Sequence, residues 1–208
     1  MEIFIRGLLI GFSIAAPVGP IGVLCIRRTL AEGRLIGLLT GLGAASADAL
    51  YAAIAAYGLT VLMAFLVGQQ TWIHLIGGVF LVYLGLRTIF TSPADQAART
   101  ESGSLIRAYS STFFLTITNP ITIISFAAIF AGLGFGSNEN NYINATITVI
   151  AVFLGSASWW LLLSGGVSLF RERVTVGVMS WVNRISGLLI LGFGLAAIWL
   201  SIQASIFV

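Results

Sequence analysis

Charged side chains are scarce in this sequence, and lysine is absent. Only 8% of its 208 residues are charged, whereas soluble domains carry about 25%. The ten basic residues are all arginines spread along the chain, so the clustered basic surface that binds nucleic acid is missing. Cys25 is the single cysteine, which excludes an internal disulfide and any site built from several thiolates. These absences argue against a soluble domain and against a nucleic-acid partner.

Long apolar runs take the place of charge. Hydrophobic residues make up 58% of the chain, and six runs are each near or above the roughly 20 residues that cross a bilayer as a helix. The runs lack the alternation of apolar and polar residues that a barrel strand shows. Helices are the remaining way to pair the backbone N–H and carbonyl groups in lipid. The sequence therefore predicts an all-α membrane protein with six transmembrane helices, at approximately 3–26, 35–66, 72–90, 109–133, 142–170 and 176–207.

The arginines predict how these helices are oriented. On the side of the N-terminus and of the connections after even-numbered runs, the only arginine is Arg6, near the start of the first run. The other nine lie at the three alternate connections, which the positive-inside rule places in the cytoplasm, with both termini outside. These nine are Arg27, Arg28, Arg34, Arg87, Arg99, Arg107, Arg171, Arg173 and Arg184.

The two halves of the chain resemble each other. "WIHLIGGVFLVYLGLRTI" from Trp72 aligns without gaps to "WVNRISGLLILGFGLAAI" from Trp181, and "GPIG" at Gly19 aligns to "NPIT" at Asn119. "GLGAAS" in the second run is faintly similar to "FLGSAS" in the fifth. Chance similarity between apolar, glycine-rich helices is the alternative. Because each half has three runs, an odd number, the second half crosses the membrane in the opposite orientation to the first, as in many secondary transporters. The sequence predicts two inverted three-helix repeats, residues 1–90 and 109–208, joined by a cytoplasmic linker, residues 91–108.

Prolines interrupt the first and fourth runs at matching positions. Pro17 and Pro20 lack the N–H that a helix needs and disfavour helical backbone in the residue before them, so a break is expected just before Pro20. Gly19 precedes Pro20, and Asn119 is a good N-cap before Pro120. Each proline can therefore begin a half-helix, whose free N–H groups suit a carboxylate. A simple proline kink is the alternative interpretation.

Asp48 is the only acidic residue deep inside a run. A charge there costs about 2.5–3.5 kcal/mol or more, so the side chain is expected to face the interior. A rise of about 1.5 Å per residue from the nearest arginines places Asp48, Pro17 and Pro120 near mid-membrane. A structural carboxylate, bonded to a neighbouring helix, is the alternative to a functional one. Helical spacing puts a small and polar set on one face: Gly37, Gly41, Ala44, Asp48, Tyr51 and Ala55.

Other polar and aromatic residues are interpreted as structural. Ser156 and Ser158 are expected to hydrogen-bond between helices. Trp159 and Trp160 are expected to pack in the core or face lipid, and His74 is interpreted as an interfacial residue at the outer end of the third run.

Two segments carry a resemblance to a known family. "APVGPIGVLCIRRTLAEGRLIGLLTGLGAASADALYAAIAAYGL" and "LTITNPITIISFAAIFAGLG" resemble the lysine exporter (LysE) superfamily of bacterial amino-acid exporters, over nearly the whole chain. Many relatives have a lysine after the Asn-Pro pair, where this chain has Ile121, so export of lysine itself is not implied. The resemblance implies functional roles for Pro17, Gly19, Pro20, Asp48, Asn119 and Pro120.

The sequence thus predicts a secondary exporter of amino acids or related small zwitterions in the bacterial inner membrane. The proton gradient or the membrane potential would drive it, no cofactor is expected, and a homo-oligomer is left open. Asp48 would bind the substrate ammonium or a coupling proton, and Tyr51 is included with the half-helix starts among the substrate-binding residues.

Four alternatives remain open. Export of a metal cation is disfavoured because Asp48, His74 and Cys25 make no ligand set, and export of another small solute is the broader version of the same idea. An intramembrane enzyme is the third: an aspartyl protease would need two carboxylates, and a serine hydrolase would need a base near a buried serine, for which His74 is expected to lie too near the surface. A structural membrane subunit would explain the glycine-rich faces but not a lone mid-membrane Asp48.

Overall fold

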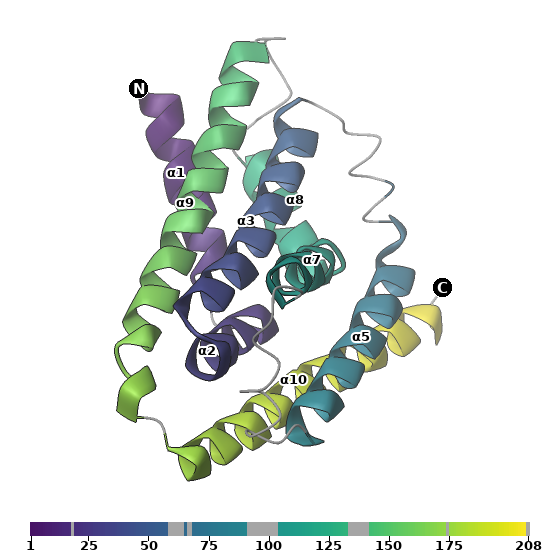
Figure 1. Cartoon of the computed structure of the whole chain (residues 1–208). Helices are drawn as coiled ribbons and strands as arrows, with labels where there is room; N and C mark the ends of the chain where they lie inside the picture. Colours follow the sequence, from purple (N-terminus) through teal and green to yellow (C-terminus); the bar gives the residue numbers. More distant parts are fainter. Residues whose placement is uncertain are drawn as a thin grey trace.

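The chain folds into helices throughout the part that the structure describes. The computed structural model describes residues 1–17, 19–57, 65, 68–90, 104–132, 142–173 and 175–206, and no strand occurs among them. The all-α prediction is confirmed for these residues. In chain order the elements are α1 (Glu2–Ala15), α2 (Pro20–Glu32), α3 (Arg34–Ala56), α5 (Gln70–Phe90), α7 (Ser104–Ile117), α8 (Pro120–Gly132), α9 (Tyr142–Ser168), the 3-10 helix η1 (Arg171–Arg173) and α10 (Val176–Ile206) (Figure 1).

Several of these helices are long and apolar enough to cross a membrane. Within the described residues, α3, α5, α9 and α10 meet that condition singly, and the bent pair α1–α2 meets it as a fifth candidate. The fourth predicted run is divided between α7 and α8, and this pair is not among the candidates. The structure therefore supports a multi-span membrane protein with four or five candidate spans, and six spans stay a prediction.

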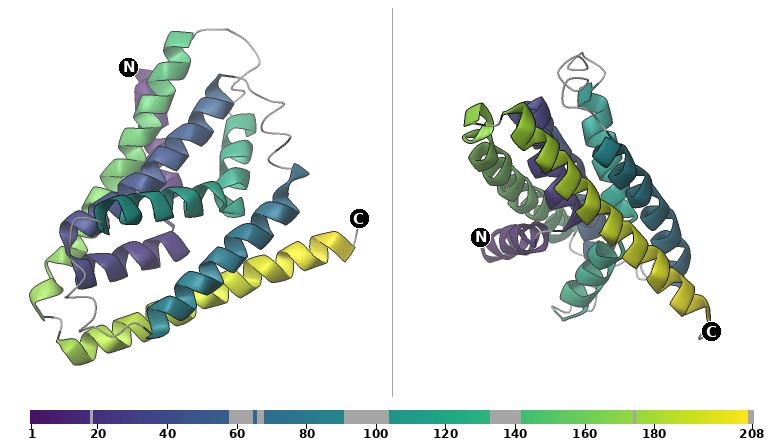
Figure 2. Two further views of the ribbon diagram at one scale, coloured as in Figure 1. Left: turned by 45° about the vertical axis from the view of Figure 1, so that its right-hand side comes forward. Right: turned by 90° about the horizontal axis from the view of Figure 1, so that it is seen from below.

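Both expected helix breaks are present. α1 ends at Ala15 and α2 begins at Pro20, with an angle of 80° between the two helices. Gly19 is the N-cap of α2 in extended conformation, and Pro20 occupies the first turn, where its missing N–H costs nothing. The fourth run breaks in the same way, since α7 ends at Ile117 and α8 begins at Pro120. Figure 2 shows α8 turning away from the direction of α7.

Glycines allow the helices to meet backbone to backbone. α1 packs along α9, and α3 packs against both α9 and α7 (Figures 1 and 2). A Cβ atom added at Gly155 would lie 2.0 Å from the Leu8 carbonyl oxygen, and one added at Gly43 would lie 2.3 Å from that of Tyr109. No side chain fits at either point, so glycine is required for these contacts.

α5 and α10 form a separate pair along most of their length (Figure 2). A Cβ atom at Gly78 would lie 2.9 Å from the Gly194 carbonyl oxygen, and one at Gly187 would lie 2.9 Å from that of Gly85. The glycines matched in the sequence alignment are therefore the points where these two helices touch.

Candidate functional site

A cavity of about 290 Å³ lies where the two broken helices approach α3 and α9. We refer to it as the central cavity. Pro17, Gly19, Pro20, Asp48 and Asn119, all predicted site residues, line it. The distances to the arginines predict one depth for Pro17, Asp48 and Pro120, and the fold brings Pro17 and Asp48 to one space. The lining also includes residues that sequence reasoning did not assign to the site: Ser13, Thr116, Thr122, Ser125, Trp160 and Phe193.

Asp48 faces the interior of the protein, as predicted. Its side chain is 3% exposed, and the Ser156 hydroxyl on α9 donates a hydrogen bond of 2.7 Å to its Oδ2 atom. The predicted interhelical role of Ser156 is therefore confirmed. An ionised carboxylate has about four acceptor positions, so one hydrogen bond leaves it capacity for a ligand in the cavity that it lines. Among the described residues, no arginine lines this cavity.

Tyr51 is placed behind the wall of the central cavity and not on it. Its side chain is 1% exposed, its hydroxyl donates to the carbonyl oxygen of Ile117, and its ring packs 5.7 Å from that of Phe126. Ile117 is the last residue of α7, where carbonyl groups lose their helical partners. Tyr51 thus holds the end of α7 in place. Direct contact with substrate, as the sequence suggested, stays a prediction.

The start of α2 presents backbone donors to the central cavity. Gly19 provides no side-chain cap, Pro20 has no N–H, and the Val23 N–H donates to the Gly19 carbonyl oxygen at 3.1 Å. Ile21 and Gly22 lie in the chain before Val23, so their N–H groups come before the first hydrogen bond of the helix. Both residues line the cavity. In the first turn of a helix such groups lack backbone partners and carry partial positive charge. The arrangement suits an anionic group.

The break before α8 is organised by Asn119. Its N–H donates to the Thr116 carbonyl oxygen at 3.1 Å, and its own carbonyl oxygen accepts from the N–H groups of Thr122 and Ile123. Asn119 lines the central cavity together with Thr116 and Thr122. Pro120 begins α8, but its side chain lies outside the described residues.

Trp160 lies in the core and lines the central cavity. Its side chain is 4% exposed, so the expectation that it faces lipid is wrong and the packing alternative is correct. Gly41 on α3 makes room for it, because a Cβ atom there would lie 2.2 Å from the Trp160 Cβ atom. The buried indole Nε1–H has no acceptor within the described part of the chain. A buried donor without a partner is costly, and because this atom is not accessible from the cavity in this structure, a ligand there would reach it only after the cavity wall rearranges.

A second polar cluster lies around Arg28, which the sequence had placed with Arg27 in a cytoplasmic loop. The loop assignment is wrong, because both arginines belong to α2 and are buried; their cytoplasmic side stays a prediction. The Arg27 Nε atom donates to the Asn183 side-chain oxygen on α10 at 3.0 Å. The Arg28 guanidinium donates to oxygens on two helices, at 2.9 to 3.1 Å, and we call these residues the Arg28 cluster: Thr40 on α3, and Ala108, Ser111 and Thr112 on α7. These oxygens replace water as partners and allow burial.

Metal ligands do not gather in the described part of the structure. No group of three or more His, Cys, Asp or Glu side chains that could hold an ion occurs there.

Comparisons with known proteins find relatives over most of the chain. The chain is 27% identical over 199 residues to the "Putative amino acid efflux protein YcgF" of Bacillus subtilis, covering 93% of this chain and 94% of that protein. It is 28% identical over 179 residues to the "Uncharacterized membrane protein YahN" of Escherichia coli, covering 84% and 79%. It is 25% identical over 205 residues to the "Chemotactic transduction protein ChpE" of Pseudomonas aeruginosa, covering 94% and 98%.

No solved structure matches the chain significantly. The model of the family described as LysE type translocator matches residues 12–201. This family consists of transporters and not enzymes, and its members and the apolar helices indicate a multi-pass protein of the bacterial inner membrane. The chain belongs to the LysE type translocator family.

Proposed function

We propose that this protein exports amino acids, or closely related small zwitterions, through the central cavity. The observation that carries the proposal is the meeting of a buried carboxylate, Asp48, with the start of a broken helix at Pro20 in one cavity. A zwitterion has an ammonium group that suits the carboxylate and a carboxylate group that suits the helix start. The similar Bacillus protein bears the name of an amino acid efflux protein, which supports the same class of substrate.

The two ends of the zwitterion would bind on different elements. Asp48 would accept hydrogen bonds from the substrate ammonium, while Ser156 holds the carboxylate in place. The N–H groups of Ile21 and Gly22 at the start of α2, and the indole N–H of Trp160, would donate to the substrate carboxylate. Such a site needs no arginine or lysine to hold the acid end.

We further propose that residues 1–90 and 109–208 are inverted repeats joined by residues 91–108. The α5–α10 interface supports this. When each residue is replaced by its partner in the gapless alignment of Trp72 with Trp181, a contact from α5 to α10 becomes an observed contact from α10 to α5. A Cβ atom at Gly85 would lie 2.7 Å from the Leu191 nitrogen, and one at Gly194 would lie 2.8 Å from the Val82 nitrogen. Under the alignment Gly85 corresponds to Gly194 and Val82 to Leu191. A two-fold axis between the helices would produce this exchange.

A second interface supports the same symmetry. "GLGAAS" and "FLGSAS" align Gly43 on α3 with Gly155 on α9, and each receives the backbone of a broken helix, at the Tyr109 and Leu8 carbonyl oxygens respectively. The same alignment pairs Asp48 with Trp160, and both line the central cavity. The site would therefore lie on the axis between the repeats, as in other inverted-repeat transporters.

Alternating access would follow from motion of the repeats around this site. α2 packs along α3 and is held to α7 by the Arg28 cluster, whereas its counterpart α8 contacts the other helices far less over the described residues. The arginine-bearing side, which the positive-inside rule assigns to the cytoplasm, would be the closed one here. The proton gradient or the membrane potential would drive the cycle, with Asp48 binding ammonium and proton in turn.

The test is the variant Asp48→Asn in the purified protein reconstituted into liposomes. The amide keeps the shape of the side chain and can still accept the Ser156 hydrogen bond, but it carries no charge for an ammonium or a proton. We expect a folded variant whose gradient-driven export of amino acids is lost. Glu32→Gln removes a carboxylate at the end of α2, outside the central cavity, and should export normally. Normal export by Asp48→Asn would refute the role of Asp48.

An accumulation screen tests the substrate class. Cells lacking or overproducing the protein would be loaded with dipeptides, and amino acids outside the cells would be measured. Overproduction should increase the external level of at least one amino acid. No difference for any amino acid would favour another class of solute.

A further inference from the structure

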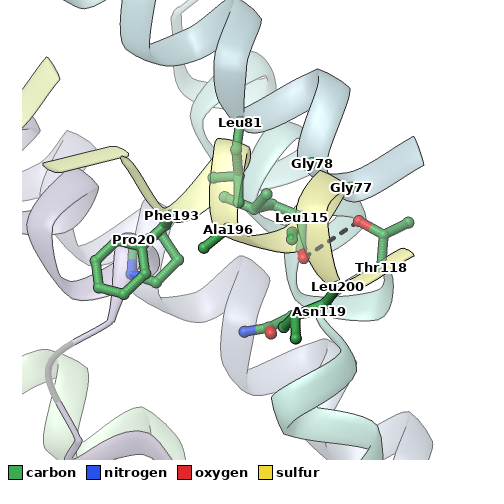
Figure 3. Close-up of a pocket in the computed structure, with 11 residues that line it drawn as sticks. Pro20, Gly77, Gly78, Leu81, Leu115, Thr118, Asn119, Phe193, Ala196 and Leu200 are labelled. Atoms are coloured by element: carbon green, nitrogen blue, oxygen red, sulfur yellow. Dashed lines mark hydrogen bonds between the residues drawn. The ribbon is translucent and has the colours of Figure 1, made fainter. Parts of the chain in front are cut away.

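A second, smaller cavity adjoins the central cavity. It has a volume of about 100 Å³ and lies between α5, α7 and α10. Pro20, Asn119 and Phe193 line both cavities, so the two spaces are neighbours at the helix breaks. Figure 3 shows Phe193 and Pro20 together on one side and Asn119 reaching in from the break between α7 and α8. We refer to this space as the apolar cavity.

The lining of the apolar cavity consists mainly of hydrocarbon. Leu81, Leu115, Ala196 and Leu200 contribute aliphatic side chains, and no charged side chain lines it among the described residues. Thr118 has a polar side chain, but its hydroxyl donates within α7, to the carbonyl oxygens of Phe114 at 2.8 Å and Leu115 at 3.3 Å (Figure 3 draws the second bond). Apart from Asn119 at the junction, little here can hydrogen-bond a ligand.

Close helix contacts hold the apolar cavity in shape. A Cβ atom at Gly77 would lie 2.7 Å from the Thr118 carbonyl oxygen, so α5 lies directly against the end of α7. Leu81 and Leu115 are 7% and 2% exposed, which places the inner wall in the core. The space is therefore bounded by packed backbone on its inner side.

We propose that the apolar cavity receives the side chain of the exported amino acid, and that the substrates are α-amino acids with apolar side chains of about the size of leucine. The proposal rests on the function proposed above. A zwitterion whose charged groups lie between Asp48 and the start of α2 would project its side chain past Phe193 into this space. The charged end of lysine, arginine or glutamate would find no partner there, and burying an unpaired charge is very unfavourable. A single methylene in such a pocket changes specificity by about tenfold or more.

The first measurement uses the unmodified full-length protein in liposomes. Export of labelled leucine would be compared with that of alanine, lysine and glutamate, and each unlabelled amino acid would compete against leucine. We expect leucine to be exported at least about tenfold faster than lysine or glutamate. Equal or faster export of lysine or glutamate would overturn the proposal.

The second measurement fills the apolar cavity with Ala196→Phe. Ala196 is exposed on α10 and lines this cavity but not the central one, so the larger side chain should not prevent folding. Leucine export should fall about tenfold, while alanine export should stay within about twofold. The matched control is Leu195→Phe, because Leu195 is exposed on the same helix and lines neither cavity. That control should change neither rate.

The remaining outcomes separate the two proposals. If Ala196→Phe reduces alanine and leucine export equally, or reduces neither, the cavity does not hold the side chain, and a lipid chain is the alternative occupant. If the unmodified protein exports no amino acid, the proposed function itself fails. If it exports amino acids without preference for apolar ones, only the assignment of the apolar cavity fails.

Discussion

Two residues that are equivalent under the proposed repeat, Asp48 and Trp160, line the same cavity with different chemistry. Asp48 provides acceptor oxygens and Trp160 provides a buried donor without an acceptor in the described residues. An α-amino acid has the complementary pair of groups. In a buried site each hydrogen bond to a charged group contributes about 1.5–3 kcal/mol, so both residues should matter for substrate affinity.

We predict that Trp160→Phe weakens substrate binding while the protein stays folded. Phenylalanine keeps an aromatic ring against Gly41 but has no N–H for the substrate carboxylate. The loss of one hydrogen bond to a charged group should raise the concentration for half-maximal export about tenfold or more. Concentration-dependent export in liposomes measures this change.

Trp159→Phe is the control for this prediction. Trp159 packs edge-on against Phe12 with ring centroids 5.3 Å apart and does not line the central cavity. Equal effects of the two variants would mean that Trp160 contributes packing alone.

The sequence revealed those site residues that are costly inside an apolar helix. Pro17 and Pro20 remove backbone hydrogen bonds, and Asp48 carries a charge, so each requires a compensating reason to be there. Trp160 and Phe193 are different, because an aromatic residue in an apolar run has no cost and looks the same whether it packs, faces lipid or lines a cavity. Only the fold separates these cases.

At the scale of elements, α2 is the helix that sequence reasoning described least well. Arginines near the end of an apolar run normally mark the membrane surface, so Arg27 and Arg28 were assigned to a loop. The acceptors that allow their burial come from Asn183 on α10 and from the Arg28 cluster on α3 and α7. Such partners lie up to 156 positions away in the chain, where no local pattern can indicate them.

We predict that Arg28→Met loosens α2 from α7. Methionine fills much of the arginine's aliphatic volume but donates no hydrogen bonds, while Thr40 and Thr112 keep their bonds to carbonyl oxygens of their own helices. Cys25 on α2 reports the change, because it is fully buried and is the only cysteine of the chain. Its alkylation by N-ethylmaleimide should become at least about tenfold faster, since a tenfold change corresponds to about 1.4 kcal/mol, less than one charged hydrogen bond.

Arg34→Met is the matched control for this prediction. Arg34 is exposed at the start of α3, so its loss should leave the reactivity of Cys25 unchanged. An unchanged alkylation rate in Arg28→Met would show that the Arg28 cluster does not hold α2 in place.

At the scale of the whole molecule, the proposed two-fold symmetry predicts that substitutions at equivalent positions of the two halves change the stability of the protein by similar amounts. Gly85 and Gly194 belong to different halves and are equivalent in the alignment: a Cβ atom at Gly85 would lie 2.7 Å from the Leu191 nitrogen, and one at Gly194 would lie 2.8 Å from the Val82 nitrogen. The sequence indicated that these glycines recur seven residues from a second glycine in each half, but not that the two helices touch there. Contact between the halves is a property of the fold.

We predict that Gly85→Ala and Gly194→Ala, at positions that the alignment of Trp72 with Trp181 makes equivalent, lower the thermal stability of the purified protein by similar amounts. Each methyl group would meet backbone of the opposite helix, and such overpacking costs about 1–3 kcal/mol. Gly192→Ala on α10 is the control, because nothing lies within 4 Å of a Cβ atom there. That change should be neutral or stabilising, since alanine favours a helix over glycine by about 0.5–1 kcal/mol. A loss of stability in only one of the two interface variants would contradict the symmetric packing, because Gly85 and Gly194 meet matching backbone atoms of the opposite helix and should respond alike.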